Sequence, residues 1–408
     1  MAQQLTLNRL AARLWGLWWA RVILVWALTR AITTGLFLAL AQTQGATYWT
    51  GPKPNYWDYL NIWDAEWFED IFSYGFGGDR GYLSLLPADD AGYVAQNDWA
   101  FLPGFPFLAR WLSFGYEWKF VAPTLTLVLS FGLALVVYRL AILQFEAQTA
   151  IWSVALLGLM PPSLIFQAGY ADTLGLLLLA LTLGLIVQRR YLWALLPIAA
   201  FSLTRPGTFA LALAAAAIWV WRFRQARNQG EEFRLSERIR LALLAALSTG
   251  LGFLWSGIAW FVTGFKDAYL ASELAWRISF LSERRFVPFV GWEIAPAYFW
   301  GSPHGPWIMY VLIVVAVLLV LLPPADQLAI ELRIWVLSFF VYLYVFFFPQ
   351  SSTFRILLMA FPMVIALAWL LVRVRRRWRW MVVVALVPLQ WWWLWECWRY
   401  AAPDFSPP

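Results

Sequence analysis

Apolar runs long enough to cross a lipid bilayer recur along the whole of this 408-residue sequence. A membrane-spanning helix needs about 20 mainly apolar residues, and the runs at 15–41, 121–143 and 241–262 reach that length. Charged residues make up 13% of the sequence, against about 25% in soluble globular domains. Because a chain inside the bilayer must satisfy its own backbone hydrogen bonds, the sequence predicts an all-α polytopic membrane protein with about eleven transmembrane helices.

The distribution of arginine residues predicts how the chain is oriented. The net charge of +7 comes from arginines grouped in short segments between apolar runs, which is typical of cytoplasmic loops and does not indicate a nucleic-acid partner. We therefore expect the N-terminus and the loop 222–240 inside, and the C-terminus outside. Two large loops, 42–119 and 263–306, would lie outside. The first apolar run is too long for a signal peptide, so we expect an uncleaved span and one integral membrane domain, 1–408.

The segment 61–76 contains the carboxylate that fits its surroundings least. At 100° per residue, most aromatic residues of this segment share one helical face, while Glu66, Glu69 and Asp70 share the other. Asp64 falls on the aromatic face. A carboxylate in apolar surroundings is costly unless it has a use, such as that of a catalytic base. The alternative is a helix cap that bonds the amides of the first turn, and the pattern leaves both roles open.

Two apolar runs are interrupted in ways that place helix ends at membrane depth. Pro161 and Pro162 break the run 151–166, and residues 204–206 separate 191–203 from 207–221. The run 191–203 gives about 20 Å of helix against a bilayer core of ~30 Å. Broken or short helices are tolerated in a membrane where they line a cavity, so we expect a cavity on the outer side.

Four charged residues are expected at the same depth as Asp64. They are Asp172, Arg205, Arg277 and Arg355. A carboxylate facing several guanidinium groups fits a lipid-phosphate substrate. Other roles remain open: Asp172 could cap a helix, Arg205 and Arg355 could reach lipid head groups, and Arg277 could pair with Glu273 one turn earlier.

The sequence offers little for metal or redox chemistry. The single cysteine, Cys397, excludes an intramolecular disulfide, and the single histidine, His304, excludes a histidine-cluster metal site. We expect no metal or other cofactor.

Several short motifs resemble, in the same order, those of the GPI mannosyltransferase 2 (PIG-V)-like family and its bacterial homologues. The segment 63–68, WDAEWF, is similar to the family's WD-x-x-[WY]-[FY] signature. The segments 100–106, 169–174 and 203–207 are similar to its AFFPxYP, Y-[ST]-E-x-L-F and LTRPxG elements. Weaker similarity surrounds Arg277 and Arg355. The chain departs from the family at Asp172, where glutamate is usual, and at Gly104, where a bulkier residue is usual.

The resemblance implies a GT-C glycosyltransferase fold and inverting, metal-independent transfer of mannose from a polyprenyl-phosphate mannose. Asp64 would be the general base, and Arg205, Arg355 and Arg277 would hold the leaving phosphate. Further contacts to substrate are expected from the following residues: Trp63, Glu66, Trp67, Tyr170 and Asp172.

The resemblance leaves the acceptor open. The family's named member extends a glycolipid, whereas arginine far outnumbers lysine here and no N-x-[ST] sequon is present. These features favour a bacterial plasma membrane and a lipid-linked or cell-envelope glycan as acceptor. The alternatives are a GT-C transferase for another sugar, such as arabinose or glucose, a flippase or transporter of lipid-linked sugars, and a non-catalytic partner subunit.

Overall fold

The computed structural model describes residues 17–81, 94–277 and 286–401, and every regular element in those ranges is a helix. The longest are α2 (Trp18–Ala41), α6 (Trp118–Ile142), α8 (Asp172–Val187), α10 (Thr208–Gln229), α11 (Leu235–Gly252), α15 (His304–Leu321), α16 (Ile330–Phe346) and α19 (Arg376–Trp393). Shorter α-helices are α3 (Tyr56–Tyr59), α4 (Asp64–Tyr74), α5 (Gly104–Trp111), α7 (Ala147–Leu159), α9 (Tyr191–Ser202), α12 (Leu254–Thr263), α13 (Ala268–Ala275), α14 (Gly291–Trp300), α17 (Thr353–Ile356) and α18 (Pro362–Arg373). The 3₁₀ helices η3 (Asp98–Ala100) and η4 (Pro161–Gln167) also bear on the site.

Four described helices are long and apolar enough to cross a membrane by themselves. They are α2, α6, the continuous segment Leu235–Thr263 and α15, and two bent helix pairs would raise the number to six. The protein is therefore a multi-pass membrane protein. The expected number of about eleven transmembrane helices is not reached among the described residues, because other apolar helices are too short. For example, α8 has 16 residues and α9 has 12.

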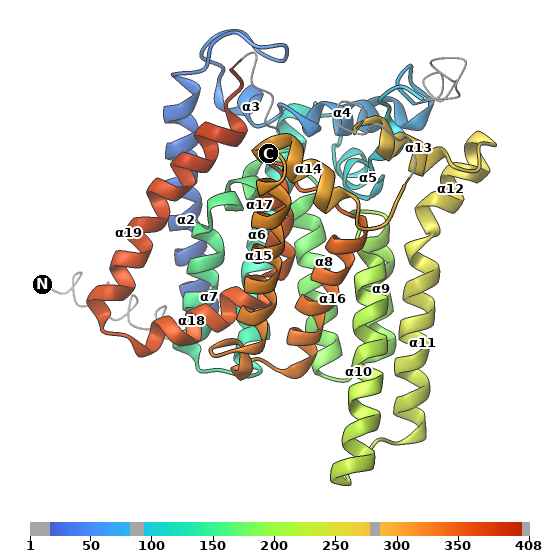
Figure 1. Ribbon diagram of the computed structural model, residues 1–408. Coiled ribbons are helices and arrows are strands. Elements are labelled where there is room, and N and C mark those ends of the chain that lie inside the picture. The colour runs from blue at the N-terminus through green and yellow to red at the C-terminus, as the bar shows by residue number, and fades with distance from the viewer. Residues whose placement is uncertain (1–16, 82–93, 278–285, 402–408) are drawn as a thin grey trace, which may run out of the picture.

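The helices that surround the candidate site lie together at one end of the bundle, which we call the α4 end (Figure 1). There α4 contacts α5, and α13 packs on η3. The arginine-rich connections α10–α11 and α18–α19 lie at the opposite end (Figure 1). This separation agrees with the expected division between the loops 42–119 and 263–306 and the loop 222–240. That the α4 end faces outward stays a prediction.

Both expected interruptions of apolar runs are confirmed. α9 ends at Ser202 and α10 begins at Thr208, so residues 203–207 form the turn that carries Arg205. This turn touches the start of α5, where the Gly104 amide donates to the Leu203 carbonyl oxygen at 2.6 Å. A Cβ at Gly104 would lie 2.7 Å from that same oxygen, which explains why a bulkier residue is absent here.

A buried arginine stabilises the second interruption, where α7 meets η4 at an angle of 84°. Arg30 of α2 donates to the Gly158 carbonyl oxygen at 2.7 Å and to the Ser163 carbonyl oxygen at 2.8 Å. Gln390 of α19 adds a bond to the Ser163 hydroxyl at 3.0 Å. Carbonyl oxygens at a helix end have no partner within the helix, and a cation there is favourable. Arg30 thereby fixes the segment that leads to α8.

We expect Arg30→Leu to lower the melting temperature of the purified protein in lipid nanodiscs. Leucine would leave the carbonyl oxygens of Gly158 and Ser163 short of donors in apolar surroundings, and hydrogen bonds from a charged donor contribute about 1.5–3 kcal/mol. Arg110→Leu is the matched control because Arg110 is exposed on α5. A variant at Arg30 that melts with the wild type would show that this arginine does not stabilise the break.

Candidate active site

Asp64 is the first residue of α4, and the helix sorts its side chains as the sequence pattern predicts. Phe68 is buried, whereas Glu69 is exposed. One expectation is wrong: Tyr74, which the helical period places on the aromatic face with Asp64, is 70% exposed. It is the last residue of α4, and the chain turns away at Gly75, which has a φ of 67°.

The turn before α4 shows that Asp64 does not act as a helix cap. The cap residue is Trp63, and no side-chain bond caps this end. Trp63 has a φ of 62°, a region that costs energy for a non-glycine residue and must be held by its surroundings. Its indole Nε1 donates to the Trp398 carbonyl oxygen at 3.0 Å, and Trp398 Nε1 donates to the Tyr59 carbonyl oxygen at 3.0 Å. These bonds hold the turn that directs Asp64 inward.

Asp64 joins three residues from distant parts of the chain in a cluster of two carboxylates and two guanidinium groups. Asp64 Oδ2 accepts from Nη1 and Nη2 of Arg355, each at 3.0 Å. Arg355 Nη1 also lies 3.5 Å from Asp172 Oδ2, and Arg205 Nη2 lies 3.3 Å from Asp172 Oδ1. The side chains of Asp172 and Arg355 are 3% and 7% exposed, whereas that of Asp64 is 25% exposed. We call this group the Asp64 cluster; its formal charges balance, and it is most open at Asp64.

Separate elements supply the partners of Asp64. Asp172 begins α8, and the cap position is Ala171 with no side-chain cap bond, so the capping alternative for Asp172 is also wrong. Arg205 reaches Asp172 across Gly175, where a Cβ would lie 2.7 Å from the Arg205 side chain. Arg355 belongs to the short helix α17. Arg205 and Arg355, for which lipid head groups were the alternative partners, therefore pair with carboxylates.

Tyr170 orients both Asp64 and Arg355. Its hydroxyl accepts from the Asp64 amide at 3.1 Å and donates to the Ile62 carbonyl oxygen at 3.1 Å. The Arg355 guanidinium lies over its ring, 5.1 Å from the centroid. The expected contact between Tyr170 and substrate stays a prediction, but its buried position beside the Asp64 cluster is clear.

The described contacts do not bring Arg277 to the Asp64 cluster. Arg277 pairs with Glu273 at 3.3 Å, which is the alternative that the sequence left open. Its neighbour Trp276 packs edge-on against Trp67, with ring centroids 4.9 Å apart. Trp276, which directly follows α13, thus contributes an aromatic contact to α4, and a phosphate contact by Arg277 stays a prediction.

Arg80 was not singled out by the sequence, yet it organises the polar face of α4. Arg80 Nη2 lies 2.7 Å from Glu66 Oε1, and Arg80 Nε lies 3.1 Å from Asp70 Oδ2. Its guanidinium lies over the Trp67 ring at 4.8 Å. Glu66 and Asp70, which the helical period places on the polar face of α4, therefore both pair with Arg80, and their side chains are 23% and 27% exposed.

Asp98, on η3 and outside the membrane-spanning helices, is predicted to make stability depend on pH. Burial raises its pKa to about 7 from an ordinary 3.8, Asp70 adds to the increase, and Arg80 opposes it. A raised acid pKa means that the ionised form is disfavoured in the folded state. The stabilisation is therefore complete below about pH 4 and is lost as the pH rises to about 7, at no more than about 1.4 kcal/mol per pH unit.

We expect Asp98→Asn to remove this slope and to melt above the wild type at pH 8. Melting temperatures of both proteins between pH 4.5 and pH 8 provide the measurement. Asp267→Asn is the control, since Asp267 is exposed. Parallel profiles for Asp98→Asn and the wild type would contradict the assignment.

The described residues contain no group of three or more His, Cys, Asp or Glu side chains that could hold a metal ion. Metal-independent chemistry stays a prediction.

No family model and no curated protein matches the sequence. Among solved structures, the chain is similar to apo ArnT from Cupriavidus metallidurans, with 15% identity and a TM-score of 0.47 over 88% of this chain and 61% of that one. It is also similar to the oligosaccharyltransferase of Archaeoglobus fulgidus, with 13% identity and a TM-score of 0.43 over 93% of this chain and 54% of the other. This chain spans less than two thirds of the length of either protein. Its activity therefore has to be argued from its own site.

Proposed function

We propose that the protein is an inverting mannosyltransferase with a GT-C fold. It would move mannose from a polyprenyl-phosphate mannose to a lipid-linked or cell-envelope glycan at the outer face of a bacterial plasma membrane. The observation that carries the proposal is the contact of the partly exposed Asp64 with the buried Arg355, which Asp172 and Arg205 extend. A group that can accept a proton lies beside cations that can hold a phosphate. The sugar, the lipid donor and the fold name rest on the motif resemblance.

Asp64 serves as the general base in this proposal. In the described part of the chain, both bonds to its carboxylate end on Oδ2, which leaves Oδ1 for the acceptor hydroxyl. The hydroxyl proton passes to Asp64 while the hydroxyl oxygen bonds to the anomeric carbon. The bond from that carbon to the phosphate oxygen breaks, and its electron pair stays on the polyprenyl phosphate. The leaving group gains one negative charge as Asp64 loses one, so the total charge is unchanged.

Arg355 links the base to the phosphate. Without substrate, the two guanidinium groups balance the two carboxylates of the Asp64 cluster, and a phosphodiester adds one negative charge. Arg355 can turn donors toward that phosphate because a planar guanidinium carries five N–H groups in a fixed fork. The turn weakens its pairing with Asp64 and frees the carboxylate to accept a proton. Arg205, paired with Asp172, lies on the other side of the phosphate site.

Incubation of the purified protein with polyprenyl-phosphate mannose, and separately with the arabinose and glucose donors, tests the proposal. Mass analysis of a panel of envelope glycolipids should show addition of one mannose, with inverted anomeric configuration and in the presence of EDTA. Transfer from another donor alone would assign a different sugar. Movement of the donor lipid across a bilayer without cleavage would indicate a flippase. Loss of activity with EDTA would contradict the metal-independent mechanism.

A further inference from the structure

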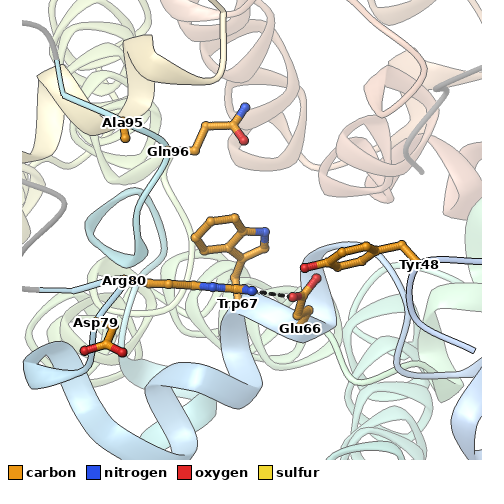
Figure 2. Close-up of a pocket in the computed structure, with 7 residues that line it drawn as sticks. All are labelled: Tyr48, Glu66, Trp67, Asp79, Arg80, Ala95 and Gln96. Atoms are coloured by element: carbon orange, nitrogen blue, oxygen red, sulfur yellow. Dashed lines mark hydrogen bonds and ion pairs between the residues drawn. The ribbon is translucent and has the colours of Figure 1, made fainter. Parts of the chain in front are cut away.

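A cavity of about 540 Å³ lies on the polar side of α4. Its described lining consists of Tyr48, Glu66, Trp67, Asp79, Arg80, Ala95 and Gln96. Figure 2 shows Arg80 and Tyr48 approaching Glu66 from opposite sides, with Ala95 and Gln96 across the opening. Cavities of about 300–1,000 Å³ suit small ligands.

Trp67 links the lining of the cavity to the side of α4 that carries Asp64. Residues three apart on a helix are neighbours on its surface, so Trp67 lies one turn from Asp64 on the same side of α4. The Trp67 ring also lines the cavity. A ligand that fills the cavity and extends past this ring would bring its end to the exposed part of Asp64.

Glu66 is held in a fixed position to receive hydrogen bonds. Its Oε2 accepts from Trp49 Nε1 at 2.7 Å, and its Oε1 accepts from Arg80 Nη2 at 2.7 Å. A carboxylate has about four acceptor sites, so two bonds leave capacity for hydroxyl donors. Gln96 is exposed at the opening and supplies both an amide donor and an amide acceptor.

The charges in the lining disfavour an anion. The lining contains two carboxylates, Glu66 and Asp79, and one guanidinium, Arg80, which already bridges Glu66 and Asp70. A phosphate here would meet an excess of negative charge, whereas neutral hydroxyl groups can donate to Glu66. Tyr48 is 76% exposed and provides a ring on which the apolar face of a pyranose can pack.

We infer that this cavity is the binding site for the acceptor, and that it takes a neutral, hydroxyl-rich saccharide chain. The inference rests on the proposed function and adds the residues and the chemical class of the acceptor. The saccharide lies along Tyr48 and Glu66, and its terminal hydroxyl passes Trp67 to reach Asp64. The donor phosphate remains on the other side of Asp64, beside Arg355.

Calorimetric titration with α-linked mannotriose tests the cavity directly. The protein should be in lipid nanodiscs, because alkyl maltoside detergents carry sugars that would compete. Ala95→Trp places a bulky ring in the opening and should weaken binding on the order of tenfold or more, and Tyr48→Ala should weaken it about 3–10-fold. Tyr74→Ala is the matched control, since Tyr74 is 70% exposed and outside the lining.

Two further readouts separate this inference from the proposed function. In transfer assays, Tyr48→Ala should raise the KM for the glycan acceptor and leave kcat and the donor KM unchanged. Inorganic phosphate should not compete with mannotriose. The cavity assignment fails if the wild type binds no mannotriose, if Ala95→Trp binds it as the wild type does, or if phosphate competes. Binding that responds to Ala95→Trp without any cleavage of polyprenyl-phosphate mannose would keep the saccharide site and reject the transferase.

Discussion

Asp64→Asn should reduce the rate of mannosyl transfer by about 10²–10⁴, the usual contribution of a positioned base. An asparagine amide has nearly the same shape but cannot accept the proton of the acceptor hydroxyl. Its carbonyl oxygen can still accept from Arg355, so the fold should persist. The change also removes one negative charge from the Asp64 cluster, so binding of the anionic donor should be unchanged or tighter.

Two measurements test this expectation together: single-turnover transfer from labelled donor, and equilibrium binding of the same donor. Glu69→Gln is the matched control, because Glu69 lies on the same helix with an exposed side chain. It should transfer mannose at the wild-type rate. Retained turnover in purified Asp64→Asn would end the assignment of the base, whatever the state of the other residues.

Arg355→Lys should lower kcat/KM by about 10²–10³, the loss seen when one preorganised donor to a developing anion is removed. Lysine keeps the charge but has a compact ammonium group on a flexible stem. It cannot reproduce the guanidinium that contacts Asp64 Oδ2 with both Nη atoms and Asp172 with one of them. The base and the phosphate site would then lose their common partner.

The comparison with Arg205→Lys sharpens this test. Arg205 contacts Asp172 alone among the described acidic residues, at 3.3 Å, so its lysine variant should lose less and mainly in the donor KM. Steady-state kinetics of both variants, with melting temperatures to show that each is folded, provide the measurement. Equal and small losses of kcat/KM in the two variants would contradict the role of Arg355 as the common partner of the base and the phosphate.

The sequence best predicted the features that depend on a single helix. The period of 61–76 predicted both the helix α4 and the inward direction of Asp64, because burial follows the helical period. The proline and Thr-Arg-Pro interruptions likewise predicted the ends of α7 and α9. These features depend on residues that are close in sequence.

Pairings between distant residues could not be predicted. Arg355 meets Asp64 across 291 positions, and Arg30 meets Ser163 across 133. No periodicity reports such contacts, so the sequence placed Arg355 at the depth of Asp64 but could not predict that the two side chains pair. Arg80 was missed for another reason: it lies only 14 positions from Glu66, but their contact depends on how the turn between them folds.

The short side chain of Asp172 has a physical role in the Asp64 cluster. Its short side chain is shared by Arg205 and Arg355, with one oxygen toward each. A longer glutamate would need a different spacing of the two arginines. Asp172 is therefore placed to hold both cations before the donor arrives.

The bond from Trp63 to Trp398 joins residues that are 335 positions apart in the sequence. During synthesis, the ribosome makes the turn before Asp64 long before it makes Trp398. Until then, the nascent chain contains Asp64 without the hydrogen bond that holds the turn before it. The turn before Asp64 gains this bond only after translation has passed Trp398, whose carbonyl oxygen accepts from the Trp63 indole.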